Sequence, residues 1–366
     1  MRILHVLNHV KCSGNGIVDA TVDLACVQSA LRQDVAVASG GGDYEALLAE
    51  HGVAHYLLDQ RRPQVRFPEI AAGFALIVGR FRPDVVHAQM RTAVVIARLV
   101  RTVARYAIVA SIHTHKVKIE LLMALADRSI AVSEDVRRTM VAAGFPARKL
   151  IVIQNGSLGS VRERSLPSDA IPLFRPAITT IAGMYERKGI TELIAAFIVI
   201  APDFPQAHLY IVGDGPDRDA FERQARDTPV GTRIHFEGFQ AAPKRWLRST
   251  DVFVLASRAE PSGLVLADAR ALGCAIVASN VGGIPEVLDG GSAGILVPPK
   301  DSAALASAIA SLLSDTERRT ALARTASQNI SRFSVERVAR ETLVVYRSAL
   351  GRRFRDGNGV TMQLKD

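Results

Sequence analysis

Residues 258–273 read RAEPSGLVLADARALG and place two acids, Glu260 and Asp268, eight positions apart. Proline is well tolerated in the first turn of a helix, so the chain is predicted to enter a helix at Pro261-Ser262-Gly263. Glu260 then lies on the loop and Asp268 about one and a half turns inside the helix. The N–H groups of residues 263–265 would be free to meet a phosphate. The two carboxylates therefore suit a ligand with hydroxyls at both ends and phosphates in the middle better than a coupled acid–base role.

Around this stretch, short β-branched runs alternate with helical patterns along the chain, which is typical of parallel sheets with crossover helices. The expected strands are 2–7, 34–38, 54–57, 84–87, 107–112, 128–132, 150–153, 178–182, 208–212, 233–237, 251–255, 275–278 and 294–297. The expected helices are 17–31, 44–51, 67–81, 92–104, 134–143, 190–200, 218–226, 264–272, 302–313, 317–330 and 335–350.

The alternation lapses between residues 155 and 176 into glycine, serine, arginine and proline, which indicates a linker. A chain of 366 residues also exceeds one comfortable core. The fold class is therefore predicted as α/β, with two Rossmann-like doubly wound domains facing a cleft. The domains are expected to span residues 1–165 and 166–332, followed by a last helix at 333–350 and a polar tail at 351–366.

Composition favours a globular protein, with 48% hydrophobic and 22% charged residues. A location in the cytoplasm is expected from two further features of the sequence. The longest apolar run, residues 92–112, is broken by arginines and is too polar to cross a bilayer. The first residues read as a strand and not as a signal peptide. The three scattered cysteines fit reduced, structural thiols.

Positive charge is concentrated in the first half, where residues 1–165 carry 21 Lys and Arg against 14 Asp and Glu. Within it, arginines bracket an apolar helical pattern at Phe67–Phe81. Two interpretations stay open: a helix packed in the core with solvated arginines at its ends, or an amphipathic helix on an anionic membrane. The bracketing residues are Arg61, Arg62, Arg66, Arg80 and Arg82.

Three more glycine loops follow predicted strands, where open α/β sheets bind ligands. They are KCSGNG at 11–16, GMYERKG at 183–189 and GDGP at 213–216. The first lacks the third glycine of the dinucleotide fingerprint. In the second, the adjacent cations Arg187 and Lys188 are suited to neutralise a departing diphosphate. Each loop alone fits a plain turn equally well, but together with the two acids they describe a site for a nucleotide sugar.

The segment EPSGLVLADARALG, which begins at Glu260, resembles the E-x7-E signature of family 4 glycosyltransferases, which have the GT-B fold. Other segments agree in order and spacing: GMYERKGITELIAAF, HLYIVGDGPDRDAFE, IHFEGF, DVFVLAS and AIVASNVGGIPEVL. The resemblance spans nearly all of residues 178–314. The first half resembles the family more loosely, through RPDVVHAQM, IAVSEDVRRTM and KLIVIQNGS. The helix at 333–350 resembles the family's last helix, which crosses back to the N-terminal domain.

The resemblance implies a role for each matching residue. Glu260 would hold hydroxyls of the donor sugar, Asp268 the ribose, and Lys188 the diphosphate as it leaves. His113 occupies the place of the family's active-site histidine, so that His113, Lys188 and Glu260 form the catalytic set. The remaining donor-binding residues would be Gly14, Asn15, Gly16, Arg187, Gly213, Gly215, Phe239, Ser262, Gly263 and Leu264.

The resemblance also implies the type of reaction. Such enzymes transfer a sugar from a nucleotide-diphosphate donor with retention of anomeric configuration, without a metal ion or resident cofactor. The expected partners are the nucleotide sugar and a sugar or lipid-linked acceptor in cell-envelope or polysaccharide synthesis. The basic first half suggests contact with an anionic membrane at its inner face, and no nucleic acid is expected.

Four positions depart from the family pattern: Asp268 replaces the usual Glu, Met184 the usual Arg, Ser262 a Phe and Arg270 a Met. The first two motivate a second hypothesis, a catalytically weak partner subunit that binds a nucleotide sugar in a glycan-assembly complex. An epimerase with the same fold is a third. His113 and His115 also form a pair that fits a metal, but no third ligand is evident at suitable spacing.

Overall fold

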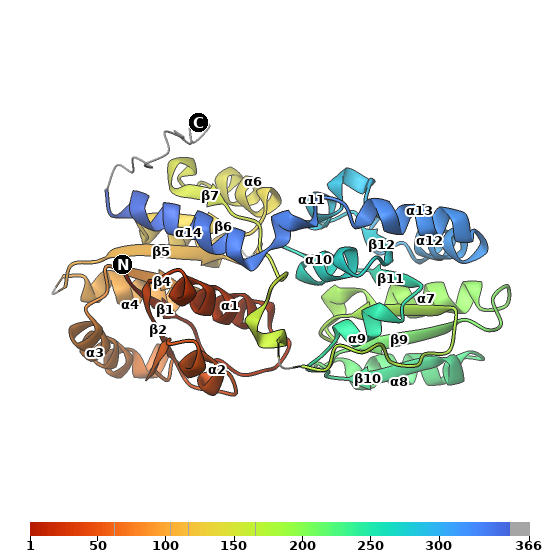
Figure 1. Ribbon diagram of the computed structural model, residues 1–366, viewed down its shortest axis with the longest axis horizontal. Helices are drawn as coiled ribbons and strands as arrows, with labels where there is room; N and C mark the ends of the chain where they lie inside the picture. Colours follow the sequence, from red (N-terminus) through yellow and green to blue (C-terminus); the bar gives the residue numbers. More distant parts are fainter. Residues whose placement is uncertain (62, 103, 116, 165, 352–366) are drawn as a thin grey trace.

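The computed structural model describes residues 1–61, 63–102, 104–115, 117–164 and 166–351. The chain forms two α/β domains placed side by side along its longest axis (Figure 1). The predicted polar tail beyond residue 351, and Arg62, lie outside the described residues. Within those ranges, no helix has the length and apolar character needed to cross a membrane.

The N-terminal domain is built on a parallel sheet of seven strands in the order β3-β2-β1-β4-β5-β6-β7. The strands are β1 Arg2–Val6, β2 Asp34–Ser39, β3 Ala54–Leu57, β4 Val85–Ala88, β5 Ala107–Ile112, β6 Arg128–Ala131 and β7 Leu150–Val152. The helices are α1 Gly16–Ala30, α2 Glu45–Glu50, α3 Pro63–Phe81, α4 Arg91–Val100, α5 Val117–Glu120, η1 Leu121–Leu125, α6 Glu134–Ala142 and η2 Ala147–Lys149. The strand order reverses between β1 and β4, which is where doubly wound sheets open a ligand site.

The second sheet has six parallel strands in the order β10-β9-β8-β11-β12-β13. They are β8 Ala177–Ile181, β9 His208–Val212, β10 Ile234–Gly238, β11 Val252–Leu255, β12 Ala275–Ser279 and β13 Ile295–Val297. The α-helices are α7 Ile190–Ile200, α8 Arg218–Arg226, α9 Lys244–Arg248, α10 Leu264–Ala271, α11 Ile284–Val287, α12 Ser302–Ser314, α13 Thr316–Ala326 and α14 Val335–Ala349. Short 3-10 turns are η3 Val161–Glu163, η4 Glu186–Lys188, η5 Gly231–Arg233, η6 Asp289–Gly291 and η7 Ile330–Phe333.

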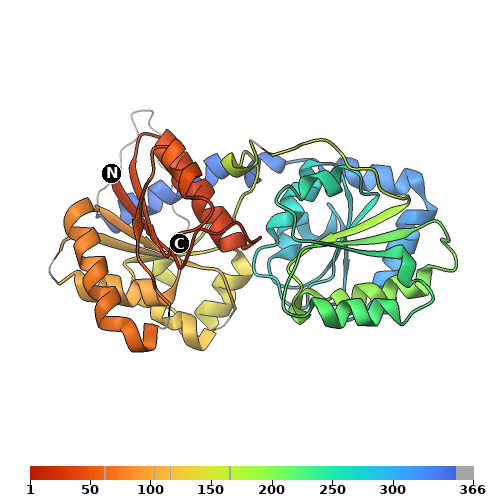
Figure 2. The ribbon, with the colours of Figure 1, turned by 90° about the horizontal axis from the view of Figure 1, so that it is seen from below.

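Each sheet is buried on both faces, as parallel sheets are. In β1, Leu4 packs into one hydrophobic cluster while its neighbour Ile3 packs into another. In β11, Val254 and Phe253 alternate in the same way. Figure 2 shows helices on both faces of each sheet. This explains the near-continuous apolar runs of the central strands, because neither of their faces meets water, whereas the edge strands β3 and β10 are partly exposed.

The predicted α/β class with two Rossmann-like domains is confirmed. Every predicted strand is present, with ends that differ by at most one residue. The helix expected at 317–330 ends at Ala326 instead, because Asn329 takes a left-handed backbone conformation with φ 55°. The helical turns between residues 117 and 125 were not predicted.

The apolar stripe of α3 packs into the core of the N-terminal domain. Its residues Ile70, Phe74, Ile77, Val78 and Phe81 are buried, and Phe67 packs against them. At the start of the helix, Arg61 and Arg66 form ion pairs with Asp59. The core-packed interpretation of this helix is therefore correct, and its apolar stripe is not available to a membrane.

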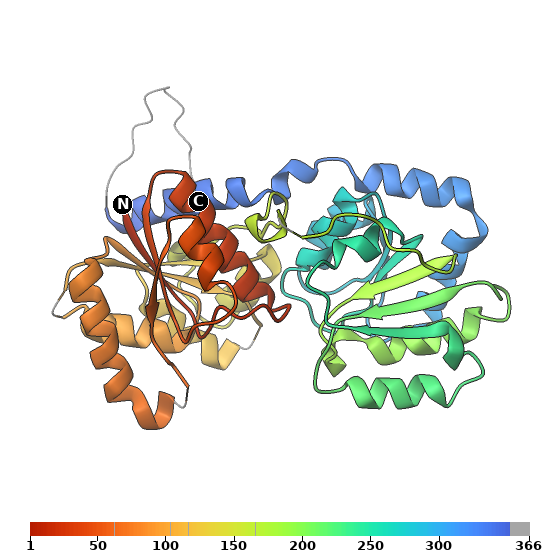
Figure 3. The same cartoon turned by 60° about the horizontal axis from the view of Figure 1, so that its bottom comes forward.

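The last helix, α14, follows the second domain in the sequence but packs on α1 and β5 of the first (Figure 3). Its Tyr346 is fully buried, and the hydroxyl lies 2.7 Å from Nδ1 of His87. The same hydroxyl accepts a longer hydrogen bond from Gln28, whose Oε1 lies 2.8 Å from Nε2 of His5. Burial lowers the pKa of His5 to about 4 and that of His87 well below its usual value. Both histidines are therefore neutral in the folded protein.

Acid is expected to destabilise the protein through these histidines. In the unfolded chain their pKa returns to about 6.5, so that between about pH 6.5 and pH 4 the unfolded state binds more protons than the folded state. The free energy of unfolding therefore falls as the pH falls through this window. We expect the melting temperature to decline between pH 7 and pH 4.5, and His5→Gln to make the decline shallower. A decline equally steep in His5→Gln and in the control His9→Gln would contradict this account.

Candidate functional site

The two domains meet through loops that follow the carboxyl ends of their strands. After β1, the backbone at Gly14 lies so close to Phe239 that an added Cβ would be 3.4 Å from its ring. At Gly16, an added Cβ would lie 3.3 Å from the side chain of Leu264. The structure thus brings together the predicted residues Gly14, Gly16, Phe239 and Leu264.

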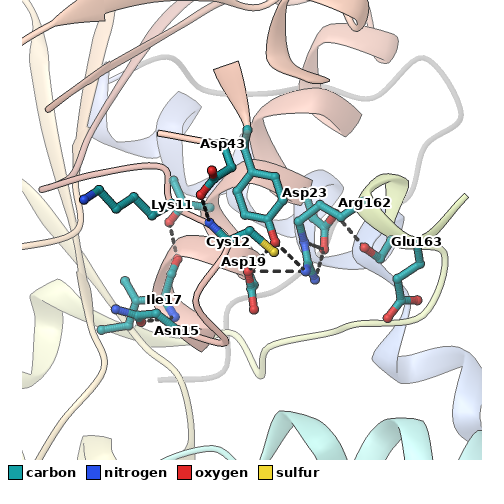
Figure 4. Close-up of polar contacts among 12 residues, drawn as sticks. Lys11, Cys12, Asn15, Ile17, Asp19, Asp23, Asp43, Arg162 and Glu163 are labelled. Carbon is teal, nitrogen blue, oxygen red and sulfur yellow. Dashed lines mark hydrogen bonds and ion pairs between the residues drawn. The ribbon is translucent and has the colours of Figure 1, made fainter. Parts of the chain in front are cut away.

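The glycine loop at residues 11–16 is held by polar contacts (Figure 4). The side chain of Asn15 caps α1 by accepting the N–H of Ile17 at 3.1 Å. Before it, the N–H of Cys12 donates to Asp43 at 2.8 Å. Asn15 therefore has a structural role at the helix start, in addition to its predicted place at the site.

A second contact between the domains lies on the other side of the site. The carboxylate of Glu286 in α11 accepts the N–H groups of Glu134 and Asp135, each at 2.8 Å, at the start of α6. A carboxylate is favourable there because the first N–H groups of a helix have no intrahelical acceptor. Close by, an added Cβ at Gly282 would lie 3.4 Å from the ring of His115.

The centre of the site is an ion pair between Lys188 and Glu260, with Nζ and Oε2 2.5 Å apart. Both side chains are largely buried, 15% and 10% exposed. Lys188 can approach because Gly189, with φ 68°, follows it: an added Cβ at Gly189 would lie 1.9 Å from the carbonyl oxygen of Ala256. A side chain at position 189 would therefore push η4, and with it Lys188, away from Glu260.

Glu260 is ionised at neutral pH. Burial by itself would raise the pKa of this carboxyl, but the Lys188 ammonium and the N–H of Gly263 outweigh it, so that the pKa lies below its usual value. The charge of Arg187 contributes in the same direction. An ionised carboxylate only accepts hydrogen bonds. Glu260 is therefore suited to hold hydroxyl groups and not to donate a proton.

Helix α10 begins at Leu264, as the expected span 264–272 has it, so that Pro261, Ser262 and Gly263 form the turn before the helix. The reason is Gly263, which adopts a left-handed conformation with φ 69° and stands just before the helix. Its N–H donates to Glu260 at 3.3 Å, which corrects the expectation that this group is free. Ser262 lies half-buried in the same turn. The N–H groups of Leu264 and Val265 are in the first turn, where no intrahelical acceptor exists.

Met184 and Arg187 have different surroundings. Met184 is fully buried in the core of the second domain, so its side chain does not reach the site. Arg187 is exposed and lies over the ring of Tyr185, with 5.2 Å from its guanidinium carbon to the ring centre. In this structure Lys188, and not Arg187, forms the close contact with Glu260.

Gly213 and Gly215 allow two loops to cross closely. An added Cβ at Gly213 would lie 2.1 Å from the carbonyl oxygen of Ala182, and one at Gly215 would lie 2.4 Å from that of Met184. Backbone packing between the loops after β8 and β9 accounts for both glycines without a ligand. Their predicted contact with the donor stays a prediction.

His113 follows β5 and turns towards the interior of the N-terminal domain. Its Nε2 lies 2.9 Å from Oε1 of Gln89, and burial lowers its pKa to about 4. The neighbouring His115 instead pairs with Asp135 at 2.7 Å. The two histidines thus have different partners, and the described ranges contain no group of three or more His, Cys, Asp or Glu side chains that could hold a metal ion.

Asp268 lies in a polar cluster that the sequence did not predict. The hydroxyl of Ser157 donates to its Oδ1 at 2.7 Å, and the ammonium of Lys244 lies 3.0 Å from the same atom. Lys244 also contacts Glu163 at 2.5 Å. Of these, only Ser157 had a sequence signal, because it follows a predicted strand at the carboxyl edge of the sheet.

Comparison with known sequences identifies both halves of the chain. Residues 14–157 match the family described as Glycosyltransferase Family 4, and residues 175–315 match Glycosyl transferases group 1. The phosphatidyl-myo-inositol mannosyltransferase of Mycolicibacterium smegmatis is 31% identical over 284 residues, 73% of this chain and 72% of that protein. The lipopolysaccharide core biosynthesis glycosyltransferase LpsE of Rhizobium meliloti is 31% identical over 173 residues, 47% of this chain and 48% of that protein. The chain thus matches about half the length of several curated relatives.

Solved structures share the two-domain arrangement. Anabaena HepE in complex with UDP-glucose superposes with a TM-score of 0.80 at 22% identity, over 95% of this chain and 100% of that one. WaaG, a glycosyltransferase involved in lipopolysaccharide biosynthesis, gives a TM-score of 0.75 at 13% identity, over 94% and 99% of the two chains. The chain belongs to glycosyltransferase family 4 and has the GT-B fold.

Proposed function

We propose that this protein is a retaining, metal-independent glycosyltransferase that moves a sugar from a nucleotide-diphosphate donor to an acceptor bound by the N-terminal domain. The observation that carries the proposal is the buried Lys188–Glu260 pair at the start of α10, beside the glycine loop at residues 11–16. The cation of Lys188, the carboxylate of Glu260 and the N–H groups of the first turn of α10 lie next to one another there. A donor with a diphosphate and sugar hydroxyls needs these three features.

The residues would divide the work as follows. Glu260 would accept hydrogen bonds from hydroxyls of the donor sugar. The resemblance to the family implies that His113, which contacts Gln89 in this structure, would lie on the N-terminal side of the same sugar. The bond between the anomeric carbon and the diphosphate oxygen breaks, and the electron pair leaves with the diphosphate. Lys188 and the N–H groups of Leu264 and Val265 stabilise the charge that develops on it. The acceptor hydroxyl forms the new bond on the same face, which preserves the anomeric configuration, and its proton passes to an oxygen of the departing diphosphate.

The chemical class of donor and acceptor is supported by relatives. Anabaena HepE has been crystallised with UDP and UDP-glucose. The names of two similar sequences describe a phosphatidyl-inositol mannosyltransferase and a lipopolysaccharide core glycosyltransferase. We therefore propose a glycan or lipid-linked acceptor in cell-envelope or polysaccharide synthesis. Contact with an anionic membrane at the cytoplasmic face belongs to the same proposal, because residues 1–165 are basic and η1 exposes Leu121, Leu122 and Leu125.

One observation favours a second candidate function. The arginine that the family usually has at position 184 is replaced by a methionine buried in the core, so that one cation is missing from the site. This fits a partner subunit that binds a nucleotide sugar but turns it over weakly. Binding of a nucleotide sugar with no turnover on a panel of donors and acceptors would favour the partner subunit over the enzyme.

We expect Lys188→Met and Glu260→Gln each to lower the release of nucleoside diphosphate from the donor by about tenfold or more. The first change removes the charge that stabilises the leaving diphosphate, and the second weakens the hold on the sugar. Release is measured with UDP-glucose, GDP-mannose and ADP-glucose in turn. The control is Arg324→Met, which removes an exposed cation on α13. Wild-type rates in both site variants, with melting curves like those of the wild type, would contradict the assignment.

A ligand screen identifies the base of the donor. A nucleoside diphosphate that binds only the folded protein raises the apparent stability by mass action, by about 2.7 kcal/mol at a hundred times its Kd. We expect one of UDP, GDP and ADP to raise the melting temperature clearly more than the others. Lys188→Met should reduce that rise, because it removes the cation that faces the diphosphate. The same rise with each nucleotide and in the variant would indicate non-specific binding.

A further inference from the structure

The cluster around Asp268 joins the two domains at one carboxylate. Ser157 and Glu163 belong to the connection that leaves the N-terminal domain after β7, whereas Lys244 begins α9 and Asp268 lies in α10 of the second domain. The charged side chains are 14% to 25% exposed, and Ser157 is buried. In Figure 4 the carboxylate of Glu163 points away from its neighbour Arg162, which is bound to Asp23. The carboxylate of Glu163 therefore pairs with Lys244 and not with Arg162.

The position of Asp268 on α10 directs it to the boundary between the domains. Residues four apart lie on the same face of a helix, and Asp268 follows Leu264, which contacts Gly16, by four positions. Both protein contacts of the carboxylate are made to one oxygen, Oδ1. No hydrogen bond from the residues that the structure describes reaches Oδ2 of Asp268. One oxygen is thus fixed by the protein and the other is left for a ligand.

The charges around Asp268 define what kind of group Oδ2 accepts. Glu163 and Asp268 are two carboxylates that share the single ammonium of Lys244. A phosphate placed here would be repelled by the excess negative charge. A neutral hydroxyl donates a hydrogen bond to a carboxylate without adding charge. The ribose of a nucleotide has such hydroxyls.

We propose that Lys244, together with Ser157, is a positioning residue for ribose recognition. The two residues hold Oδ1 of Asp268 so that Oδ2 faces the ribose, and Glu163 fastens Lys244 to the connection between the domains. An aspartate has one methylene fewer than the glutamate usual at this position. Fixing its orientation in advance removes part of the entropy cost of binding. This inference rests on the proposed function, because it needs a nucleotide at the site.

The experiment compares a nucleoside diphosphate with its 2′,3′-dideoxy counterpart, using UDP, GDP and ADP and measuring Kd by titration calorimetry. A hydrogen bond to a charged group contributes about 1.5–3 kcal/mol, which corresponds to a preference of roughly tenfold or more for the ribose form. We expect the wild type to show this preference and Lys244→Met and Ser157→Ala to reduce it to below about threefold. Affinity for the dideoxy form should stay the same, because Lys244 acts only through Asp268.

The variants separate positioning from a general structural role. Lys244→Arg keeps the positive charge and should retain part of the preference, whereas the control Arg248→Met, an exposed residue on the same helix, should retain all of it. Ser157→Ala leaves no unpaired charge, so it reports on the site even where Lys244→Met impairs folding. When the donor is a nucleotide sugar that the enzyme turns over, Lys244→Met and Ser157→Ala should each raise KM, while kcat should change less.

Two results would overturn the proposal in distinguishable ways. In the first, the wild type binds a nucleoside diphosphate and prefers the ribose form, but Lys244→Met and Ser157→Ala weaken the binding of both forms equally, or weaken neither. The two residues then have no role in ribose recognition, and the proposed function stands. If wild type binds none of the three nucleoside diphosphates, the proposed function fails and this inference fails with it.

Discussion

The buried charge of Glu260 is the constraint around which the site is built. A carboxylate away from water is costly unless it is paired and hydrogen-bonded. Lys188 supplies the paired charge and the N–H of Gly263 a hydrogen bond. The backbone then has to come close on two sides, and it does so at glycines: Gly189 lies against the carbonyl of Ala256, and Gly282 against the carbonyl of Glu260 itself. The glycines of these loops are thus a consequence of placing one charge in the interior.

The second domain meets the first through contacts other than this charge, whose partners all lie in the second domain. Glu286 accepts the free N–H groups at the start of α6, and α14 returns to bury Tyr346 beside His87. Near the glycine loop, Arg162 in the connection forms ion pairs with Asp19 and Asp23 of α1 (Figure 4). The contacts of Glu286 and Arg162 are polar, whereas α14 also buries Leu343 and Val345 in the core of the N-terminal domain. A change in the relative position of the domains would exchange the polar contacts for water. Such an interface is compatible with opening and closing around a substrate.

Much of this structure could be predicted from the sequence, because local patterns decide it. Alternating β-branched and helical segments specified the two sheets, and glycines after the strands pointed to the edge where Gly14, Gly16, Phe239 and Leu264 meet. What could not be predicted depends on tertiary packing. Nothing local distinguishes Lys244 from other surface lysines, and its partners lie 81 and 24 positions away, at Glu163 and Asp268. The start of α10 at Leu264 agrees with the expected span, but the hydrogen bond from the N–H of Gly263 to Glu260 could not be predicted, because it depends on the left-handed conformation of Gly263.

The charges along the first turns of α10 would give the proposed site a direction. Just before its first turn, the ammonium of Lys188 and the carboxylate of Glu260 balance each other, so that the N–H groups of Leu264 and Val265 give this point its positive character. One turn further along, in the middle of the helix, Asp268 and Glu163 outnumber Lys244 and make the surroundings negative. Under the proposed function, the diphosphate would lie at the first of these points, because the second would repel it, and the ribose would lie at the second. The donor sugar would then lie beside Glu260.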